Sequence, residues 1–371
     1  MKRFTGGSSA TWDPEERLTR PTRYKRWTPQ RLRAAGGYWQ ARILSTAVHL
    51  ELFDWFGNRT KSARAANSRF GGTQEIWEIF LDALSAMGLL QKRTMGYENS
   101  PFTLRYLCSG EGVFLRSQHD AWNIWATLPD ILTTGKRPKI AEPFFTDQKR
   151  SERLLQSLDH DAGKIAPYVM ARLPLSRSET LLDVGGGLGS FAIACCRQFS
   201  HLRATIVEHP GVATFTSSAV KKAKIANRVK VVTVDFTKDP LPCGFDLVLI
   251  SNVLHGQGTK ENRALLRSAY RSLNPQGRIV LRDVFMNRAG TEPDWGALFS
   301  VALLLQTPKG RCYGLGEVRE WLDAARFSGI QGPFRSSPLV FDPDSVLIAE
   351  KSRIAKSTSP ASITSLAVGE E

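Results

Sequence analysis

The segment Thr180-Leu-Leu-Asp-Val-Gly-Gly-Gly-Leu-Gly-Ser190, followed by Ala204-Thr-Ile-Val-Glu208, decides the fold of this chain. A short apolar run ends in Asp183, a glycine-rich turn follows, and a second apolar run ends in Glu208 after a helix-length interval. This order predicts strand, tight loop, helix and strand, because glycine allows unusual backbone dihedrals and the close approach of a ligand. An acid at the end of the second strand can accept hydrogen bonds from both ribose hydroxyls. The pattern therefore predicts a cofactor that contains a nucleoside.

The spacing of the glycines indicates which cofactor. The dinucleotide fingerprint Gly-x-Gly-x-x-Gly places a pyrophosphate at a helix N-terminus. Here Gly189 comes one residue early, and Ser190 occupies the position of the last fingerprint glycine. The form Asp183-x-Gly185-x-Gly187-x-Gly189 resembles motif I of class I S-adenosylmethionine (SAM)-dependent methyltransferases. SAM has no phosphate, so the loop only has to pass close under its methionine and ribose parts. The alternative interpretation is an ordinary loop between strand and helix.

Length and composition bound the class of protein. The chain has 371 residues, of which 42% are hydrophobic and 23% charged, so we expect about two domains of soluble, globular type. No apolar run approaches the ~20 residues that a membrane span needs, and the N-terminus shows no apolar signal region. The five cysteines have no paired metal spacing. These features predict a cytoplasmic protein with no membrane span and no metal.

The formal net charge of +15 is concentrated near the N-terminus, where the first 35 residues hold nine Lys or Arg and three acids. Such a field attracts polyanions or anionic lipid, but a solvated basic tail is the commoner explanation. We predict a flexible basic tail over residues 1–30. The Ser-, Thr- and Ala-rich residues 352–371 predict a disordered C-terminal tail.

Helical periodicity dominates the first half of the chain. Residues 36–56 and 73–90 have apolar side chains at helical spacing, and residues 91–98 read as a short hairpin that turns at Gly96. This order favours a winged-helix fold, which is often a DNA-binding module. Residues 120–138 predict a helix with Trp122 and Trp125 on one face, where either could contact a substrate or simply pack in the core. A further helix is predicted over 151–171, so the proposed domains are 31–165 and 166–351.

Two further strands are expected to bring chemistry to the edge of the sheet where Asp183 and Glu208 end theirs. Residues 229–235 end in Asp235, which could accept from the adenine amino group while Phe236 packs against the ring. The strand over 245–254 delivers His255 to the same edge. In an open parallel sheet ligands bind outside the carboxyl ends of the strands. A histidine there is a candidate general base.

Several motifs over residues 36–351 together resemble the cation-independent small-molecule O-methyltransferases, the caffeic acid O-methyltransferase-like family. They are the glycine loop, Glu208-His-Pro-Gly-Val212, Val234-Asp-Phe236, Asn252-Val-Leu-His255, Asn274-Pro-Gln-Gly-Arg-Ile-Val-Leu-Arg-Asp283, and the segment from Gly310 to Glu317. The resemblance implies that His255 is the general base and that Asp283 and Glu317 flank it. It also implies that the N-terminal region is a homodimerisation domain that helps to wall the partner's substrate pocket, which makes nucleic-acid binding unlikely.

These arguments together predict an α/β protein, with a Rossmann-like class I methyltransferase domain and an N-terminal winged-helix-like dimerisation domain. The predicted cofactor is SAM, and the predicted cofactor-binding residues are Asp183, Gly185, Gly187, Gly189, Glu208, Asp235, Phe236 and Ser251. Trp122 and Trp125 are the candidate substrate contacts.

The sequence departs from the family pattern at three places. Gly256 replaces the Asp that usually follows the histidine, Ser251 replaces a lysine common in plant members, and Tyr313-Gly314 replaces an Arg-Thr pair. These changes point toward microbial natural-product or pigment acceptors. They also leave open a SAM-dependent C-methyltransferase or hydroxylase, or a SAM-binding winged-helix protein with a regulatory or nucleic-acid-binding role.

Overall fold

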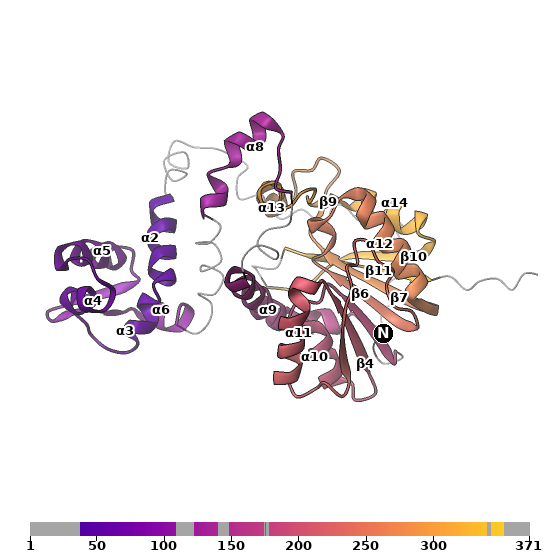
Figure 1. Cartoon of the computed structure of the whole chain (residues 1–371), viewed down its shortest axis with the longest axis horizontal. Coiled ribbons are helices and arrows are strands. Elements are labelled where there is room, and N and C mark those ends of the chain that lie inside the picture. Colours follow the sequence, from indigo (N-terminus) through magenta and orange to yellow (C-terminus); the bar gives the residue numbers. More distant parts are fainter. Residues whose placement is uncertain are drawn as a thin grey trace, which may run out of the picture.

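The computed structural model describes residues 38–108, 122–139, 148–173, 175, 178–339 and 343–351. The predicted tails at 1–30 and 352–371 lie outside these residues. Helices α2 to α6 gather at one end of the molecule and a seven-stranded sheet forms the other (Figure 1).

The N-terminal region is helical and ends in the predicted hairpin. Its elements are α2 (Tyr38–His49), α3 (Leu52–Phe56), α4 (Ala63–Phe70), α5 (Gln74–Ala86), β1 (Leu90–Arg93), β2 (Gly96–Asn99) and α6 (Pro101–Tyr106). The single helix predicted over 36–56 is in fact two, because Glu51 adopts a left-handed conformation with φ of 54° between α2 and α3. The Thr73 side chain accepts from the Ile76 amide at the start of α5, which satisfies one unpaired N–H of the first turn.

Helical segments lie between this region and the sheet. The helix predicted over 120–138 is interrupted, because residues 122–125 are helical, a turn follows at 126–127, and α8 (Leu128–Thr134) then ends as predicted at Gly135, which is left-handed. The long helix α9 (Gln148–Met170) matches the prediction over 151–171. It continues across the predicted domain boundary at residue 165, so that division of the chain stays a prediction.

The sheet has the strand order β10-β11-β7-β6-β3-β4-β5. Its strands are β3 (Thr180–Val184), β4 (Arg203–Glu208), β5 (Val229–Thr233), β6 (Phe245–Ser251), β7 (Leu273–Asp283), β10 (Phe327–Arg335) and β11 (Ser345–Lys351). The first five are parallel, and β11 and β10 add an antiparallel edge. Because β4 and β6 flank β3 on opposite sides, the chain reverses direction across the sheet beside the glycine loop. Ligands of open α/β sheets bind at such a switch point.

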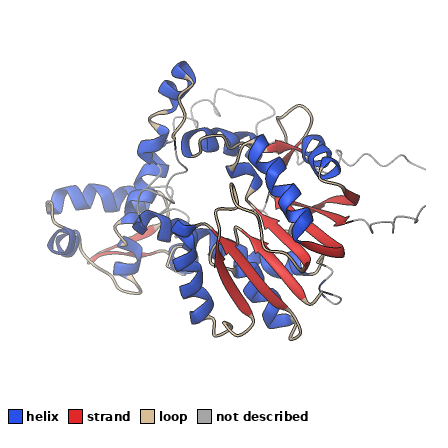
Figure 2. Cartoon of the chain, turned by 45° about the vertical axis from the view of Figure 1, so that its right-hand side comes forward, coloured by secondary structure: helices blue, strands red, loops and turns tan. Residues whose placement is uncertain are grey.

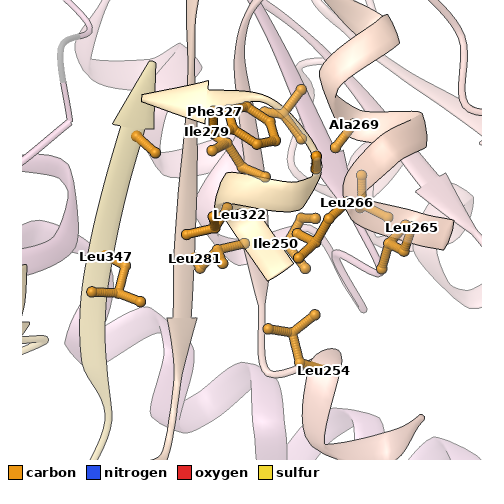
Figure 3. Packing of buried hydrophobic residues seen from close by; sticks show 14 of the residues in the cluster. Ile250, Leu254, Leu265, Leu266, Ala269, Ile279, Leu281, Leu322, Phe327 and Leu347 are labelled. Carbon is orange, nitrogen blue, oxygen red and sulfur yellow. The ribbon is translucent and has the colours of Figure 1, made fainter. Parts of the chain in front are cut away.

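Helices cover both faces of the sheet (Figure 2). Helices α9, α10 (Ser190–Gln198) and α11 (Pro210–Lys222) bury one face, with α9 and α10 supplying Ile165, Val169 and Phe191. The other face packs against α12 (Thr259–Ser272) and α14 (Leu315–Ala324), and Figure 3 shows Leu266 and Leu322 among its buried side chains. Burying such a side chain fully stabilises the fold by roughly 1.5–3 kcal/mol.

The remaining elements lie beyond β7. They are β8 (Phe285–Met286), which pairs in parallel with β9 (Tyr313–Gly314), and α13 (Asp294–Gln306). Helix α13 contacts α8 and so links the catalytic half to the segment before α9.

Candidate active site

The glycine loop between β3 and α10 is held in a conformation that favours glycine. Gly185, Gly187 and Gly189 all have positive φ. A Cβ on Gly185 would lie 2.6 Å from Cγ2 of Val253, so a larger residue would push the loop away from the end of β6. A Cβ on Gly187 would meet nothing closer than Cδ2 of Leu155 at 4.0 Å. The loop is therefore tight against the sheet at Gly185 and open at Gly187.

Glu208 is tied to this loop at the end of β4. Its Oε1 accepts from the Gly187 amide at 2.7 Å, and its Oε2 accepts from the His209 amide at 2.9 Å. Burial raises the pKa of Glu208 to about 7, against the opposite effect of the two amides. Each carboxylate oxygen has a second lone pair, which can accept from a hydroxyl. The geometry suits the predicted contact with a ribose.

Asp183 lies behind the loop rather than at its surface. The residue is fully buried, and a Cβ on Gly186 would sit 2.8 Å from its Oδ2. Within the described residues neither carboxylate oxygen of Asp183 makes a hydrogen bond of normal geometry. Burial raises the pKa of Asp183, and the Ala192 amide partly opposes that rise. The side chain lies where it can support the loop from below, and its predicted contact with the cofactor stays a prediction.

Asp235, Phe236 and Ser251 lie around the same strand ends. Asp235 is engaged by its own turn, because Thr237 Oγ1 donates to Oδ1 at 2.6 Å and Lys238 Nζ to Oδ2 at 2.7 Å. The Phe236 ring lies 3.5 Å from the Cβ position of Gly185. The Ser251 hydroxyl accepts from Arg282 Nη1 at 3.3 Å. The structure thus brings Phe236 to the loop, while Asp235 and Ser251 already have protein partners.

His255 and Asp283 form a close polar pair at this edge of the sheet. Strand β6 ends at Ser251 rather than at 254, because Asn252 turns with φ of 57°, and His255 lies in the short 3-10 turn Leu254–Gly256. Its Nδ1 lies 2.7 Å from Oδ1 of Asp283. Burial acts to lower the pKa of His255, but the charge and hydrogen bond of Asp283 outweigh it and raise that pKa. The pair is a histidine with a fixed carboxylate partner.

Glu317 does not join this pair. Both of its oxygens accept from Arg311 Nη2, at 2.8 and 2.9 Å, in the first turn of α14. The resemblance placed Glu317 beside His255, but the carboxylate is partly exposed and is neutralised by Arg311. Asp283 alone of the two predicted acids hydrogen-bonds the histidine.

An aromatic wall on α13 was missed by the sequence analysis. The Phe299 ring packs edge-on against His255 with centroids 5.0 Å apart, and Trp295 packs on Phe299 at 4.6 Å. Trp295 and Leu298 are half exposed, although α13 is apolar on all sides. An exposed apolar helix of this kind was the available signal, because an ordinary surface helix has one polar face.

The two predicted substrate contacts, Trp122 and Trp125, lie away from the pair of His255 and Asp283 in their described contacts. Trp122 contacts Tyr38 at 6.2 Å between centroids and lies under Arg42, so it packs on α2. Trp125 is 39% exposed. A pocket of about 810 Å³ lies beside α8, and neither Trp125 nor the glycine loop nor His255 lines it. Its lining residues are Asn123, Ile124, Thr127, Asp130, Ile131, Thr134, Lys136, Arg137, Pro138 and Leu305.

The residues at the strand ends fit SAM. SAM carries sulfonium and ammonium cations, and the loop region holds two buried carboxyls whose pKa values burial raises. A cation beside them would favour their ionised forms. The open space at Gly187 leaves room for a ligand next to Glu208. In the described part of the chain no cluster of three or more His, Cys, Asp or Glu side chains could hold a metal ion. That part also holds no helix with the length and hydropathy of a membrane span.

Comparison with known proteins places the chain in a family. The model of the O-methyltransferase domain family matches residues 135–328. A 3-hydroxy-5-methyl-1-naphthoate 3-O-methyltransferase from Streptomyces sahachiroi is 28% identical over 313 residues, which cover 82% of this chain and 90% of that protein. The tetracenomycin polyketide synthesis 8-O-methyl transferase TcmO from Streptomyces glaucescens is 27% identical over 326 residues, or 85% and 94% of the two chains.

The fold is also shared with solved structures. Human N-acetylserotonin methyltransferase in complex with SAM superposes with a TM-score of 0.75 at 22% identity, covering 89% of this chain and 99% of that one. The mostly parallel sheet, its glycine loop and the acid at the end of β4 define a Rossmann-like class I methyltransferase. The chain belongs to the O-methyltransferase domain family and is a SAM-dependent O-methyltransferase. The predicted family and cofactor are confirmed, and so is an α/β fold with a Rossmann-like domain and an N-terminal helical region.

Proposed function

We propose that this enzyme methylates a hydroxyl group of a small aromatic acceptor of the polyketide or pigment type, with His255 as general base. The observation that carries the proposal is the 2.7 Å contact between His255 Nδ1 and Asp283 Oδ1. This contact fixes the tautomer in which Nδ1 carries the proton and Nε2 can accept one.

The need for a base follows from the acceptor. When bound, SAM supplies an electrophilic methyl group that is attacked in line. A phenol has a pKa near ~10, by analogy with tyrosine, and is a weak nucleophile at neutral pH. Neutral His255 takes the hydroxyl proton at Nε2, and Asp283 stabilises the imidazolium that forms. Proton transfer to a positioned base contributes roughly 10²–10⁴ in rate.

The aromatic wall supports an aromatic acceptor. Phe299 contacts His255 and is continued by Trp295 and by the exposed Leu298, so an apolar surface adjoins the base. Flat rings pack well against such side chains. The names of the two Streptomyces relatives, which refer to a naphthoate and to a tetracenomycin polyketide, support the same class of acceptor.

We also propose that the chain forms a homodimer through its N-terminal region. The proposed domains are 31–165 and 166–351, and the proposed location is the cytoplasm. Trp39 is 69% exposed on α2, and Ile76 and Ile79 are 60% and 67% exposed on α5. Exposed apolar side chains in such numbers favour an interface. Light scattering at micromolar concentration should report a dimer, and a monomer would contradict this assembly.

Methyl transfer from labelled SAM tests the function directly. A panel of hydroxynaphthoates, polyketide phenols and simple catechols should give an O-methylated product with at least one of the fused-ring acceptors. Mass spectrometry of the product distinguishes methylation at oxygen from methylation at carbon or hydroxylation. A product methylated at carbon, or hydroxylated, would contradict the proposal.

A further inference from the structure

We propose that Arg137 is a positioning residue that holds the turn of His255 from outside the catalytic half. The inference rests on the proposed role of His255 as base. It concerns a side chain that neither the motifs nor the resemblance singled out.

The first step is the contact between Arg137 and Gly310. Arg137 lies two residues after the left-handed Gly135 that ends α8. Its Nη1 donates to the Gly310 carbonyl oxygen at 3.1 Å, across 173 residues of sequence. The guanidinium is half buried, and a charged donor makes a stronger hydrogen bond than a neutral one. Arg137 thus fixes the position of the Gly310 peptide.

The second step is the contact between Gly310 and His255. A Cβ on Gly310 would lie 2.3 Å from the His255 carbonyl oxygen and 2.5 Å from Thr307 Oγ1. The Gly310 amide donates to that same Thr307 Oγ1 at 2.8 Å. Gly310 is therefore wedged between the base's own backbone and the end of α13. A displacement of the Gly310 peptide would therefore displace the His255 backbone directly, because no side chain lies between them.

The third step compares the contact from Gly310 with the other hydrogen bonds that hold the turn Leu254–Gly256. Asn262 Nδ2 donates to the Leu254 carbonyl at 2.9 Å, and the Tyr313 hydroxyl donates to the Gln257 carbonyl. These two bonds hold the ends of the turn, while Gly310 lies against its middle. Arg137 adds a tie from the segment before α9, and the same guanidinium lines the pocket beside α8. The base is thus supported from both halves of the molecule.

The test compares Arg137→Ala and Arg137→Lys with Lys139→Ala, which removes an exposed cation two residues away. We expect kcat to fall about 10-fold in Arg137→Ala, because a small misplacement of a catalytic group is costly. SAM affinity should stay within about 2-fold, and Lys139→Ala should match the parent in both. Arg137→Lys should recover part of kcat, since lysine keeps one charged donor. An unchanged kcat in Arg137→Ala would overturn the proposal.

A double-mutant cycle separates this proposal from the proposed function. If Arg137 acts through His255, Arg137→Ala should cause little further loss of kcat in a His255→Gln background. An equal loss in both backgrounds would show that Arg137 acts elsewhere. Full activity of His255→Gln alone would instead contradict the role of the base itself. Each Arg137 variant should bind SAM as the parent does, so misfolding is detected independently.

Discussion

His255 and Asp283 meet twice: ring Nδ1 lies 2.7 Å from Oδ1, and the His255 backbone amide donates to Oδ2 at 3.3 Å. The carboxylate thereby sets both the ring orientation and the backbone position of one residue. Asp283 ends β7 and His255 follows β6, and the two strands are parallel neighbours. The pair is thus a product of the sheet register, in which Ser251 lies opposite Arg282.

The pH dependence of turnover should report this pair. The pKa of His255 is raised because Asp283 outweighs the burial, and only neutral His255 can accept a proton. Turnover should therefore rise with pH through a pKa above the ordinary ~6.5 of histidine. Asp283→Asn should move this limb to lower pH and lower the plateau by about 10-fold, because the tautomer is less well fixed. A kcat profile whose acid limb stays in place in the variant would contradict the assignment.

SAM affinity should depend on pH through Glu208. Burial raises the pKa of this carboxyl to about 7, so it is largely protonated below that pH in the free enzyme. A cationic ligand that donates hydrogen bonds favours the ionised form, so affinity should increase as pH rises through about 7. Glu208→Gln should weaken SAM binding by ~1–3 kcal/mol at pH 8. It should also flatten the pH dependence, and calorimetry at pH 6 and pH 8 measures both effects.

Gly310→Ala should lower activity more than an alanine substitution at any other glycine of helix α14 or of the loop before it. The new Cβ would clash with the His255 carbonyl at 2.3 Å, and backbone has little freedom to give way. We expect a loss of at least 10-fold in kcat. Gly316→Ala is the matched control, because its Cβ meets nothing within 4 Å. Equal activity of the two variants would show that the turn tolerates displacement.

The sequence predicted those parts of the fold in which the residue types of one short segment determine the backbone conformation. The glycine loop, the apolar strands and the acid at Glu208 follow from residue types that suit one backbone geometry. The kink at Glu51 could not be predicted, because it needs a left-handed residue that no glycine marks. The turn at Asn252 escaped prediction for the same reason, so the strand was expected to run to residue 254 with His255 directly after it.

The site was predicted less completely than the sheet. The position of Asp283 beside His255 was predicted only from the family resemblance, and in the structure the parallel register of β6 and β7 brings the two residues together. The ion pair of Glu317 with Arg311 could not be predicted from the sequence. The two residues lie six positions apart, and whether their side chains meet depends on the conformation of the loop before α14. The contact from Arg137 to Gly310 spans 173 residues and has no sequence signature.

The most direct test of the account is the activity of His255→Gln on an acceptor whose hydroxyl is not ionised at pH 7. We predict that this variant binds SAM within about a factor of three of the parent, since the proposed cofactor contacts, apart from Ser251 at the end of β6, lie at or after the ends of β3, β4 and β5. Its turnover should fall roughly 10²-fold or more, because no other group takes the proton. Full turnover on that acceptor at pH 7 would show that His255 is not the base.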